Sequence, residues 1–308
     1  MLLGSLPAIE FRQMMPPLEE NMAQQIALYG KGGTGKTTIA ANLAAALAEA
    51  GHRVLLVGCG PTADSSHLLV GEAVPQTLFS YLQAELKPSA ADIITTGYRG
   101  IGCIEVGDFP GSESCTSRSI AAALKLLQEL AVIDAYAPDY TIYDMPGDVG
   151  CIGDPMLESM QIDISLVVTT ADFQAMYAAN RLIGLLERLQ HPGGMALVIN
   201  GSISSFEDSF VTDFAGQVGL GIAATIPRSL AVRHSELYGK TVIEAGPLST
   251  HAYTYRRLAR LVSELGRTGG NGVKAAPLAA ARLKEWAYEW GKRLGELEFG
   301  IIQDGAGI

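Results

Sequence analysis

Residues 30–38 read Gly-Lys-Gly-Gly-Thr-Gly-Lys-Thr-Thr, and this stretch decides the fold. It satisfies the phosphate-binding pattern G-x-x-x-x-G-K-[ST]. The apolar run Ile26–Tyr29 before it predicts a strand, and the alanine-rich run Thr38–Ala50 after it predicts a helix. Strand, glycine loop and helix are the context that the pattern requires, so an ordinary glycine turn is the weaker explanation. We therefore expect a P-loop NTPase that binds ATP or GTP.

The loop predicts a role for each of its residues. Glycines let backbone N–H groups turn toward phosphate oxygens, and the helix N-terminus adds the positive end of its dipole. Lys36 is expected to reach the β- and γ-phosphates, and the hydroxyl of Thr37 is expected to bind Mg²⁺. The nucleotide-binding residues expected from the loop are Gly30, Gly32, Gly33, Thr34, Gly35, Lys36, Thr37 and Thr38.

Three aspartates that follow predicted strands are candidates for the catalytic part of the site. Asp144 comes directly after the run Tyr140–Tyr143, where a P-loop protein usually holds Mg²⁺ directly or through water. Asp148 is expected to position water or to relay a change, and Asp64 to lie near the attacking water. For Asp144 and Asp64 the alternative is a solvated loop acid or a helix cap.

Lys31 is a further catalytic candidate. In a subset of P-loop proteins a lysine at this position reaches the nucleotide of the opposite subunit in a face-to-face dimer. It would there supply positive charge at the departing γ-phosphate, as an arginine finger does. The alternative is a solvated loop lysine.

Apolar runs alternate with helical patterns along the chain. The runs are Ile26–Tyr29, Val54–Val57, Gly102–Val106, Tyr140–Tyr143, Ile164–Thr169, Ala196–Ile199 and Gly221–Ile226. Continuous apolar strands separated by helices predict an α/β fold, with a mostly parallel sheet and helices on both faces. We expect a flexible N-terminal extension over residues 1–22, the P-loop domain over 23–266, and a linker with a C-terminal helical tail over 267–308.

The tail carries Leu283, Trp286, Trp290, Leu294 and Leu297 at the spacing of one helix face. Such a helix either packs on its own domain or binds a partner, and the first is favoured.

Composition excludes several classes of protein. The chain has 308 residues and a net charge of −10, which argues against unspecific binding to nucleic acid or to a membrane surface. No apolar run approaches the about 20 residues of a membrane span. The N-terminal residues lack the pattern of a secretory signal. We expect a cytoplasmic protein.

Two of the four cysteines lie in loops of small residues. Cys115 and Cys151 each follow a predicted strand, and Cys151 comes directly after the Asp144–Asp148 loop. Small neighbours leave room for an inorganic group, and a [4Fe–4S] cluster needs four thiolates, which two subunits would supply together. On the residues alone, free thiols remain the better explanation for this pair. Cys59 and Cys103 are expected to be small buried residues.

Taken together, the chain resembles the nitrogenase iron protein and its relatives, from about Gln25 to Leu265. The matching blocks are residues 29–38, 57–59, 102–105, Cys115 with Arg118, 143–144, 147–149, Cys151, 175–180, 226–228, 241–244 and 255–256. The resemblance implies a homodimer with one bridging [4Fe–4S] cluster and one MgATP per subunit. It implies that electrons from a donor such as ferredoxin or flavodoxin pass singly to a larger catalytic partner.

The resemblance also implies roles for particular residues. Cys115 and Cys151 match the cluster ligands. Lys31, Lys36, Thr37, Asp64, Asp144 and Asp148 match nucleotide and switch positions, and Asn200, Pro227, Arg228 and Tyr255 fall where the family contacts the base.

The chain departs from the family at Gly60 and Thr62, where an aspartate and a lysine are usual. These and other changes favour a nitrogenase-like reductase over a true dinitrogen-fixing one. The main rival is a cluster-free positioning ATPase of the septum or plasmid-partition type, which shares the two-lysine loop.

Overall fold

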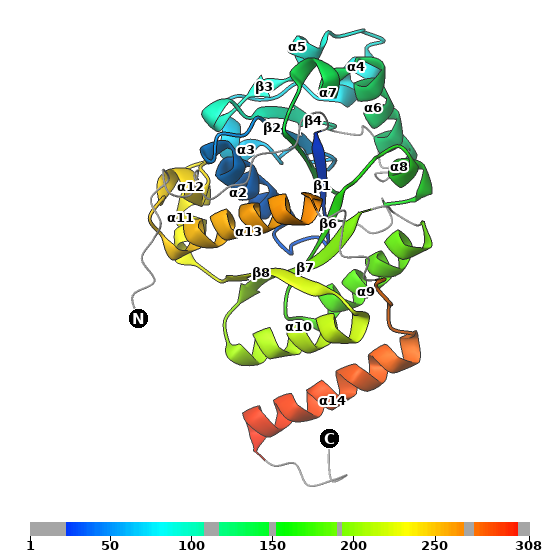
Figure 1. The fold of residues 1–308 in the computed structure, drawn as a ribbon, viewed down its shortest axis with the longest axis vertical. Helices are drawn as coiled ribbons and strands as arrows, with labels where there is room; N and C mark the ends of the chain where they lie inside the picture. The colour runs from blue at the N-terminus through cyan, green and yellow to red at the C-terminus, as the bar shows by residue number, and fades with distance from the viewer. Residues whose placement is uncertain (1–22, 108–116, 148–151, 190–192, 268–273, 301–308) are drawn as a thin grey trace.

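An eight-stranded sheet forms the centre of the molecule, with strand order β3-β4-β2-β5-β1-β6-β7-β8. The computed structural model describes residues 23–107, 117–147, 152–189, 193–267 and 274–300. Its strands are β1 (Gln24–Tyr29), β2 (Val54–Gly58), β3 (Thr95–Thr96), β4 (Gly102–Glu105), β5 (Tyr140–Asp144), β6 (Ile164–Thr169), β7 (Gly194–Ser202) and β8 (Gly221–Pro227). All neighbouring pairs are parallel except β3 with β4. The predicted α/β fold with a mostly parallel sheet is confirmed (Figure 1).

Helices cover both faces of the sheet. On one face lie α2 (Lys36–Glu49), α3 (His67–Val70), α12 (Val242–Ala245) and α13 (Thr250–Arg267), with α11 (Leu230–Leu237) beside α12. On the other lie α4 (Leu78–Gln83), α5 (Ala90–Ile93), α6 (Ser117–Glu129), α7 (Val132–Tyr136), α8 (Asp154–Glu158), α9 (Phe173–Arg188) and α10 (Ser205–Val218). A short 3₁₀ turn, η1 (Tyr98–Gly100), precedes β4.

The central strands are apolar because both of their faces are covered. Every residue of β2, β5 and β6 is buried. Alternate side chains enter two separate cores, so that Ile142 packs toward α2 whereas Tyr143 packs toward α6 and α8. A strand buried on both faces reads as a continuous apolar run, which is why these strands are visible in the sequence.

The strand order brings three loops together at one edge. β5 pairs with both β1 and β2, and Asp144 at its carboxyl end lies opposite Leu28 and Gly58. The loops that follow β1, β2 and β5 therefore leave the sheet side by side. In parallel sheets ligands bind at this carboxyl edge.

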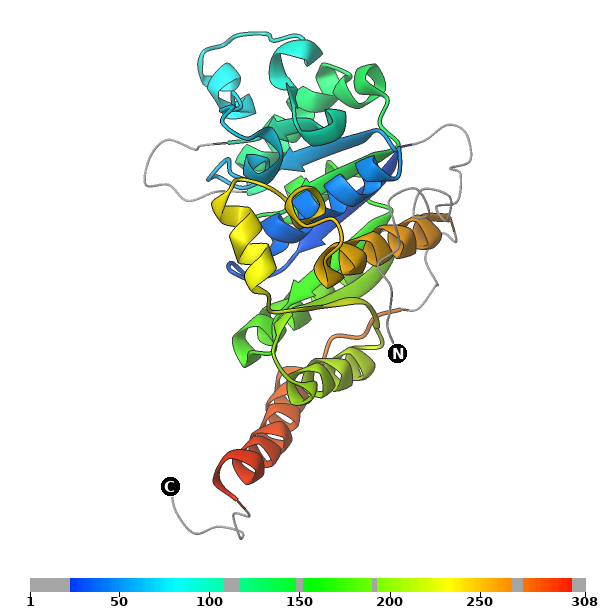
Figure 2. The same ribbon diagram turned by 90° about the vertical axis from the view of Figure 1, so that its left-hand side faces the viewer.

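The C-terminal helix α14 (Ala280–Phe299) packs against α10 (Figure 2). Leu283, Trp286 and Trp290 are buried, and both indole N–H groups donate to Oδ2 of Asp213, at 2.7 and 2.8 Å. The prediction that this helix packs on its own domain is confirmed for its first half. Farther along, Leu294 and Leu297 are exposed by 52% and 68%, so the expected apolar face is covered only in part.

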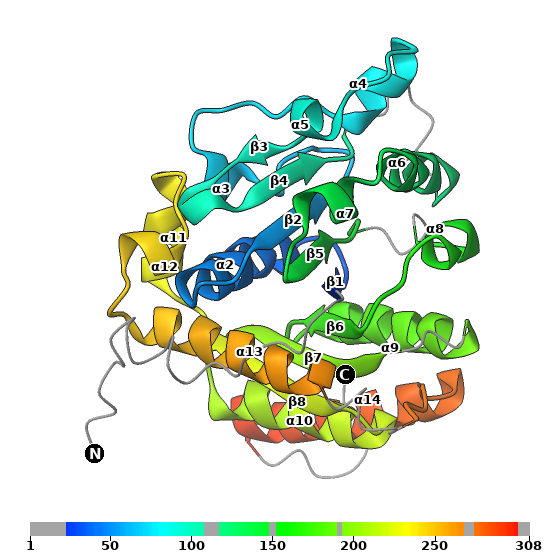
Figure 3. The same cartoon turned by 45° about the horizontal axis from the view of Figure 1, so that its top comes forward.

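A buried ion pair joins α2 to α13 on the opposite face from α6, α8 and α9 (Figure 3). Arg256 donates from Nε and Nη2 to the two carboxylate oxygens of Glu49, at 2.7 and 2.9 Å, and from Nη1 to the carbonyl of Pro247. Both charged side chains are at most 3% exposed. No helix among the described residues has the length and apolarity to cross a membrane.

Candidate nucleotide site

The glycines of the loop are required by its close packing. Gly30 and Gly35 have φ angles of 152° and 90°, which favour glycine. A Cβ atom on Gly30 would lie 2.3 Å from the carbonyl oxygen of Val168, and one on Gly35 would lie 2.2 Å from Nδ2 of Asn200. The loop is thus held from below by β6 and β7, and α2 begins directly after it.

Lys36 is a buried cation within this loop. Its side chain is 6% exposed, and its Nζ atom donates to the carbonyl oxygen of Lys31 at 3.2 Å. Burial lowers the pKa of this ammonium group, and the neighbouring Asp144 partly opposes the shift. A desolvated cation at a helix N-terminus is well suited to phosphate oxygens.

Asp144 lies at the centre of a small group of oxygen atoms. Its Oδ2 atom accepts hydrogen bonds from Thr37 Oγ1 at 2.6 Å and from Ser65 Oγ at 2.7 Å. Its Oδ1 atom is buried and has no hydrogen-bond partner among the residues that the structure describes. Burial raises the pKa of this carboxyl group, against the hydrogen bonds and the charge of Lys36. An unsatisfied carboxylate oxygen beside a threonine hydroxyl fits the oxygen ligands that Mg²⁺ prefers.

A hollow of about 510 Å³ opens above these residues. It brings together six residues predicted from the sequence: Gly32, Gly33, Lys36, Thr37, Asp64 and Asp144. Asp64 is exposed, and its Oδ1 atom accepts a hydrogen bond from Thr62 Oγ1 at 2.6 Å. Gly60 also lines the hollow, so both departures from the family pattern lie at its rim.

Lys31 lies in a different place from Lys36. It is exposed and lines a neighbouring hollow of about 610 Å³ together with Tyr177 and Arg181. The two hollows share Gly32 and Gly147, whose N–H and carbonyl groups form a 2.8 Å hydrogen bond between them. Lys31 therefore lines no part of the hollow that contains Asp144.

The four residues predicted to contact the nucleotide base lie in different parts of the structure. Asn200 donates from Nδ2 to the carbonyl of Thr34 at 2.8 Å, so it supports the loop. Pro227 and Arg228 are exposed at the carboxyl end of β8. Tyr255 is 1% exposed and packs in the core beneath α13, so its ring does not line the hollow.

The P-loop residue Thr38 also points away from the hollow. It donates from Oγ1 to Glu236 on α11 at 2.7 Å. This contact ties the start of α2 to α11.

Three predicted site residues, Asp148, Cys115 and Cys151, lie outside the described residues. The ends of their two loops are described, and they touch. A Cβ atom on Gly153 would lie 2.9 Å from Oγ of Ser117, where α6 begins. In the sequence, each cysteine is two residues from one of these ends.

The other two cysteines are buried, as predicted. Cys59 and Cys103 are 0% exposed. Burial raises the pKa of the Cys103 thiol to about 12, which keeps it protonated and unsuited to a metal.

Several residues of the site were not predicted. Ser65 bonds to Asp144, Ser66 bonds to Glu105, and Glu236 bonds to Thr38. For Ser65, the signal in the sequence was its place next to Asp64 in the loop after β2. For Glu236 the chain offers no local pattern.

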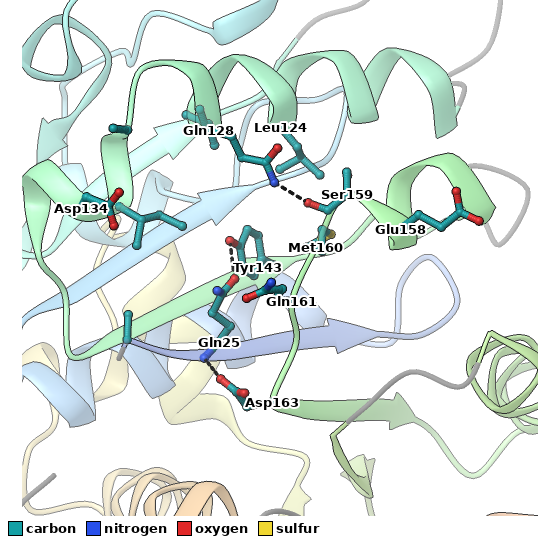
Figure 4. Close-up of a pocket in the computed structure, with 14 residues that line it drawn as sticks. Gln25, Leu124, Gln128, Asp134, Tyr143, Glu158, Ser159, Met160, Gln161 and Asp163 are labelled. Atoms are coloured by element: carbon teal, nitrogen blue, oxygen red, sulfur yellow. Dashed lines mark hydrogen bonds between the residues drawn. The ribbon is translucent and has the colours of Figure 1, made fainter. Parts of the chain in front are cut away.

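Another cavity, of about 480 Å³, lies between the far ends of α6 and α8 (Figure 4). The hydroxyl of Tyr143 points to Gln25 and donates to its Oε1 atom, and Gln128 bridges to the carbonyl of Ser159. Its lining includes three carboxylates and no Lys, Arg or His. Phosphate would be repelled there, so this cavity is poorly suited to a nucleotide.

Comparison with known proteins agrees with this geometry. Residues 24–291 match the model of a family described as 4Fe-4S iron sulfur cluster binding proteins, NifH/frxC family. The chain is 38% identical over 288 residues to nitrogenase iron protein 2 of Paenibacillus durus, covering 92% of this chain and 97% of that protein. It is 37% identical over 239 residues to nitrogenase iron protein 2 of Methanothermobacter thermautotrophicus, covering 77% and 88%.

Solved structures with a similar fold include ATPases that carry other names. The septum site-determining protein MinD of Pyrococcus horikoshii, complexed with Mg-ADP, has a TM-score of 0.65 at 22% identity, over 81% of this chain and all of that one. A ParA family ATPase from Chlorobium tepidum has a TM-score of 0.61 at 24% identity, over 77% and 98%. At such identities the likeness shows the fold alone.

Proposed function

Because the chain belongs to the NifH/frxC family of 4Fe-4S iron sulfur cluster binding proteins, we propose that it is an ATP-driven reductase. It receives electrons from a donor such as ferredoxin or flavodoxin. It passes them one at a time to a larger, nitrogenase-like catalytic component. The working form is a homodimer with one MgATP in each chain and one cluster between the chains.

The described residues support the nucleotide half of this proposal. Lys36 and the loop N–H groups bind the phosphates, while Thr37 and Asp144 hold Mg²⁺. Asp64, at the rim of the same hollow, orients the attacking water. Lys31 of one chain faces the nucleotide of the other, so hydrolysis requires the dimer.

The cluster half rests on the donor set and on the touching loop ends. Cys115 and Cys151 of both chains supply four thiolates, the number that a [4Fe–4S] cluster needs. The cluster supplies a centre that gains and loses single electrons. This chain's residues set its surroundings, because backbone N–H groups near the sulfides tune its potential.

One observation carries the coupling between ATP and the electron. Gly147 lines the nucleotide hollow, and Gly153 touches Ser117 at the start of α6. Only residues 148–152 separate the two glycines, and Cys151 is among them. A shift at the phosphate end is thus transmitted over a few residues to a cluster ligand.

Protein purified without oxygen tests the proposal. We expect about four iron atoms per dimer and a broad visible absorption. Cys115→Ala should abolish both, whereas Cys59→Ala, the matched control, should retain them. MgATP should shift the midpoint potential of the cluster in a redox titration. A colourless, iron-free protein after anaerobic reconstitution would refute the reductase.

A further inference from the structure

Glu105 is a buried carboxylate with no role in the proposed mechanism. It is the last residue of β4 and is 0% exposed. Its Oε1 atom accepts two hydrogen bonds from Ser66, from the backbone N–H at 2.7 Å and from Oγ at 2.6 Å. Its Oε2 atom is buried and has no hydrogen-bond partner among the described residues. A carboxylate with one unsatisfied oxygen is costly to bury in this way.

Glu105 connects the residues that line the nucleotide hollow, through Ser66, to the strand that leads along the chain to Cys115. On one side, Ser66 follows Ser65, which bonds to Asp144, and Asp64, which lines the hollow. On the other side, Glu105 is followed after two residues by the segment 108–116, which carries Cys115. Its contact with Ser66 is thus a cross-link between the two segments.

The cross-link packs closely against Gly58, which has no side chain. Gly58 lies opposite Glu105 in the sheet, and a Cβ atom there would lie 2.1 Å from Oε2 and 2.6 Å from Cβ of Ser65. On its other side Glu105 forms a bridge with Thr77. A displacement of the serine segment is therefore passed to the end of β4.

We propose that Glu105 is a positioning residue that transmits the nucleotide state from the segment 62–66 to the loop of Cys115. Asp144 Oδ2 accepts hydrogen bonds from the hydroxyls of Thr37 and Ser65, so a shift of this carboxylate when nucleotide binds would alter its bond with Ser65. Ser66 moves with Ser65, and Glu105 carries the movement into β4. This inference rests on the proposed function and adds a second connection, because the loop after Asp144 leads to Cys151 and this one leads to Cys115.

The charge of Glu105 makes the contact adjustable. Burial raises its pKa to about 7; the two bonds from Ser66 lower the pKa, and the charges of Asp144 and Asp64 raise it. The loss of the Ser66 bonds would thus favour the protonated form. Glu105→Gln keeps the shape and one acceptor oxygen but fixes the group in a neutral state, which separates the charge from the packing.

The test compares Glu105→Gln with wild type and with Glu129→Gln, a control at the exposed far end of α6. Hydrogen exchange is measured with and without MgATP in the segments 62–70 and 101–107, and iron release to a chelator is followed in parallel. In wild type and Glu129→Gln, MgATP should change the hydrogen exchange of both segments and the rate of iron release. Glu105→Gln should bind MgATP and retain the response at 62–70. The change that MgATP causes in hydrogen exchange at 101–107, and in the rate of chelation, should each be at least about fivefold smaller than in wild type.

Ser66→Ala provides a second variant, since it removes one donor and leaves the carboxylate in place. It should weaken the response at 101–107 in the same direction. The chelation response of wild type should also change with pH around neutrality, whereas that of Glu105→Gln should be flat, which a purely structural role would not produce.

The outcomes separate the two proposals. If MgATP changes neither segment in wild type, the proposed function itself fails. If wild type responds at both segments and Glu105→Gln responds equally at both, Glu105 is not the connection and the proposed function stands.

Discussion

Two lysines of the phosphate-binding loop lie in opposite surroundings, one buried and one exposed. We expect Lys36→Ala to weaken MgATP binding by about 10- to 100-fold, because a hydrogen bond to a charged group contributes about 1.5–3 kcal/mol. Lys31→Ala should bind MgATP almost normally yet hydrolyse it about a thousandfold more slowly, as loss of an arginine finger does. Calorimetric titration and phosphate release measure the two effects.

The comparison of the two variants is its own control, because both remove one ammonium group from the same loop. Hydrolysis by Lys31→Ala at the wild-type rate would remove this lysine from the mechanism.

Glu105 gives the stability of the protein a pH dependence of known sign. Its pKa is raised from 4.5 to about 7, so the folded state binds the proton more tightly than the unfolded state. The stabilisation is complete below about pH 4.5 and is lost as the pH rises through 7. Glu105→Gln should therefore remove about 3 kcal/mol from the pH-dependent change in the free energy of unfolding, the amount that corresponds to this shift in pKa. Urea unfolding of both proteins across this range measures it, and parallel curves would contradict the assignment.

The position of a site residue could be predicted where a local motif fixes it. It could not be predicted where the pairing of strands far apart in the sequence fixes it. Lys36, Thr37 and Asp144 are placed by the loop pattern and by a strand end. The contact between Ser66 and Glu105 exists only because β2 lies between β4 and β5, with Gly58 paired to both Glu105 and Asp144. No local pattern in the chain contains that information.

At the level of elements, the ion pair between α2 and α13 makes a sharp prediction. Arg256→Met leaves Glu49 buried without its partner and should lower the free energy of unfolding by about 3–5 kcal/mol. The double variant with Glu49→Leu should recover most of the loss, because no charge remains buried. Denaturant unfolding measures both.

An exposed pair on the same helix is the control. Arg260 and Glu264 are 45% and 54% exposed, so Arg260→Met should cost less than about 1 kcal/mol. A similar loss for Arg256→Met and Arg260→Met would show that burial does not decide the effect.

Elements were predicted best where their apolar period is strong. All seven predicted strands are present, with ends shifted by at most three residues. The eighth, β3, has two residues and no apolar pattern of its own. For α14 the sequence predicts an apolar face that extends to Leu297, but α10 covers this face only as far as Trp290. The sequence of α14 does not contain the length of α10, so the end of the covered part could not be predicted.

For the whole molecule, the proposed sharing of one cluster by two chains predicts that the metal stabilises the dimer. Removal of iron by a chelator should shift the protein toward monomer, because four thiolate bonds across the axis are lost. Cys115→Ala should show the same shift without chelator. Sedimentation velocity over a range of concentrations measures the equilibrium, and an equal monomer fraction with and without iron would refute a bridging cluster.

Both tryptophans of the chain lie on α14, against the carboxylate of Asp213 and the ring of Phe210. The tryptophan fluorescence of this protein, excited selectively over its eleven tyrosines, therefore reports on one helix at one edge of the sheet. A melting curve recorded by tryptophan fluorescence follows the detachment of α14 and does not report on the nucleotide hollow. Titrations of nucleotide need a dye or a labelled analogue, and a silent tryptophan signal says nothing about occupancy there.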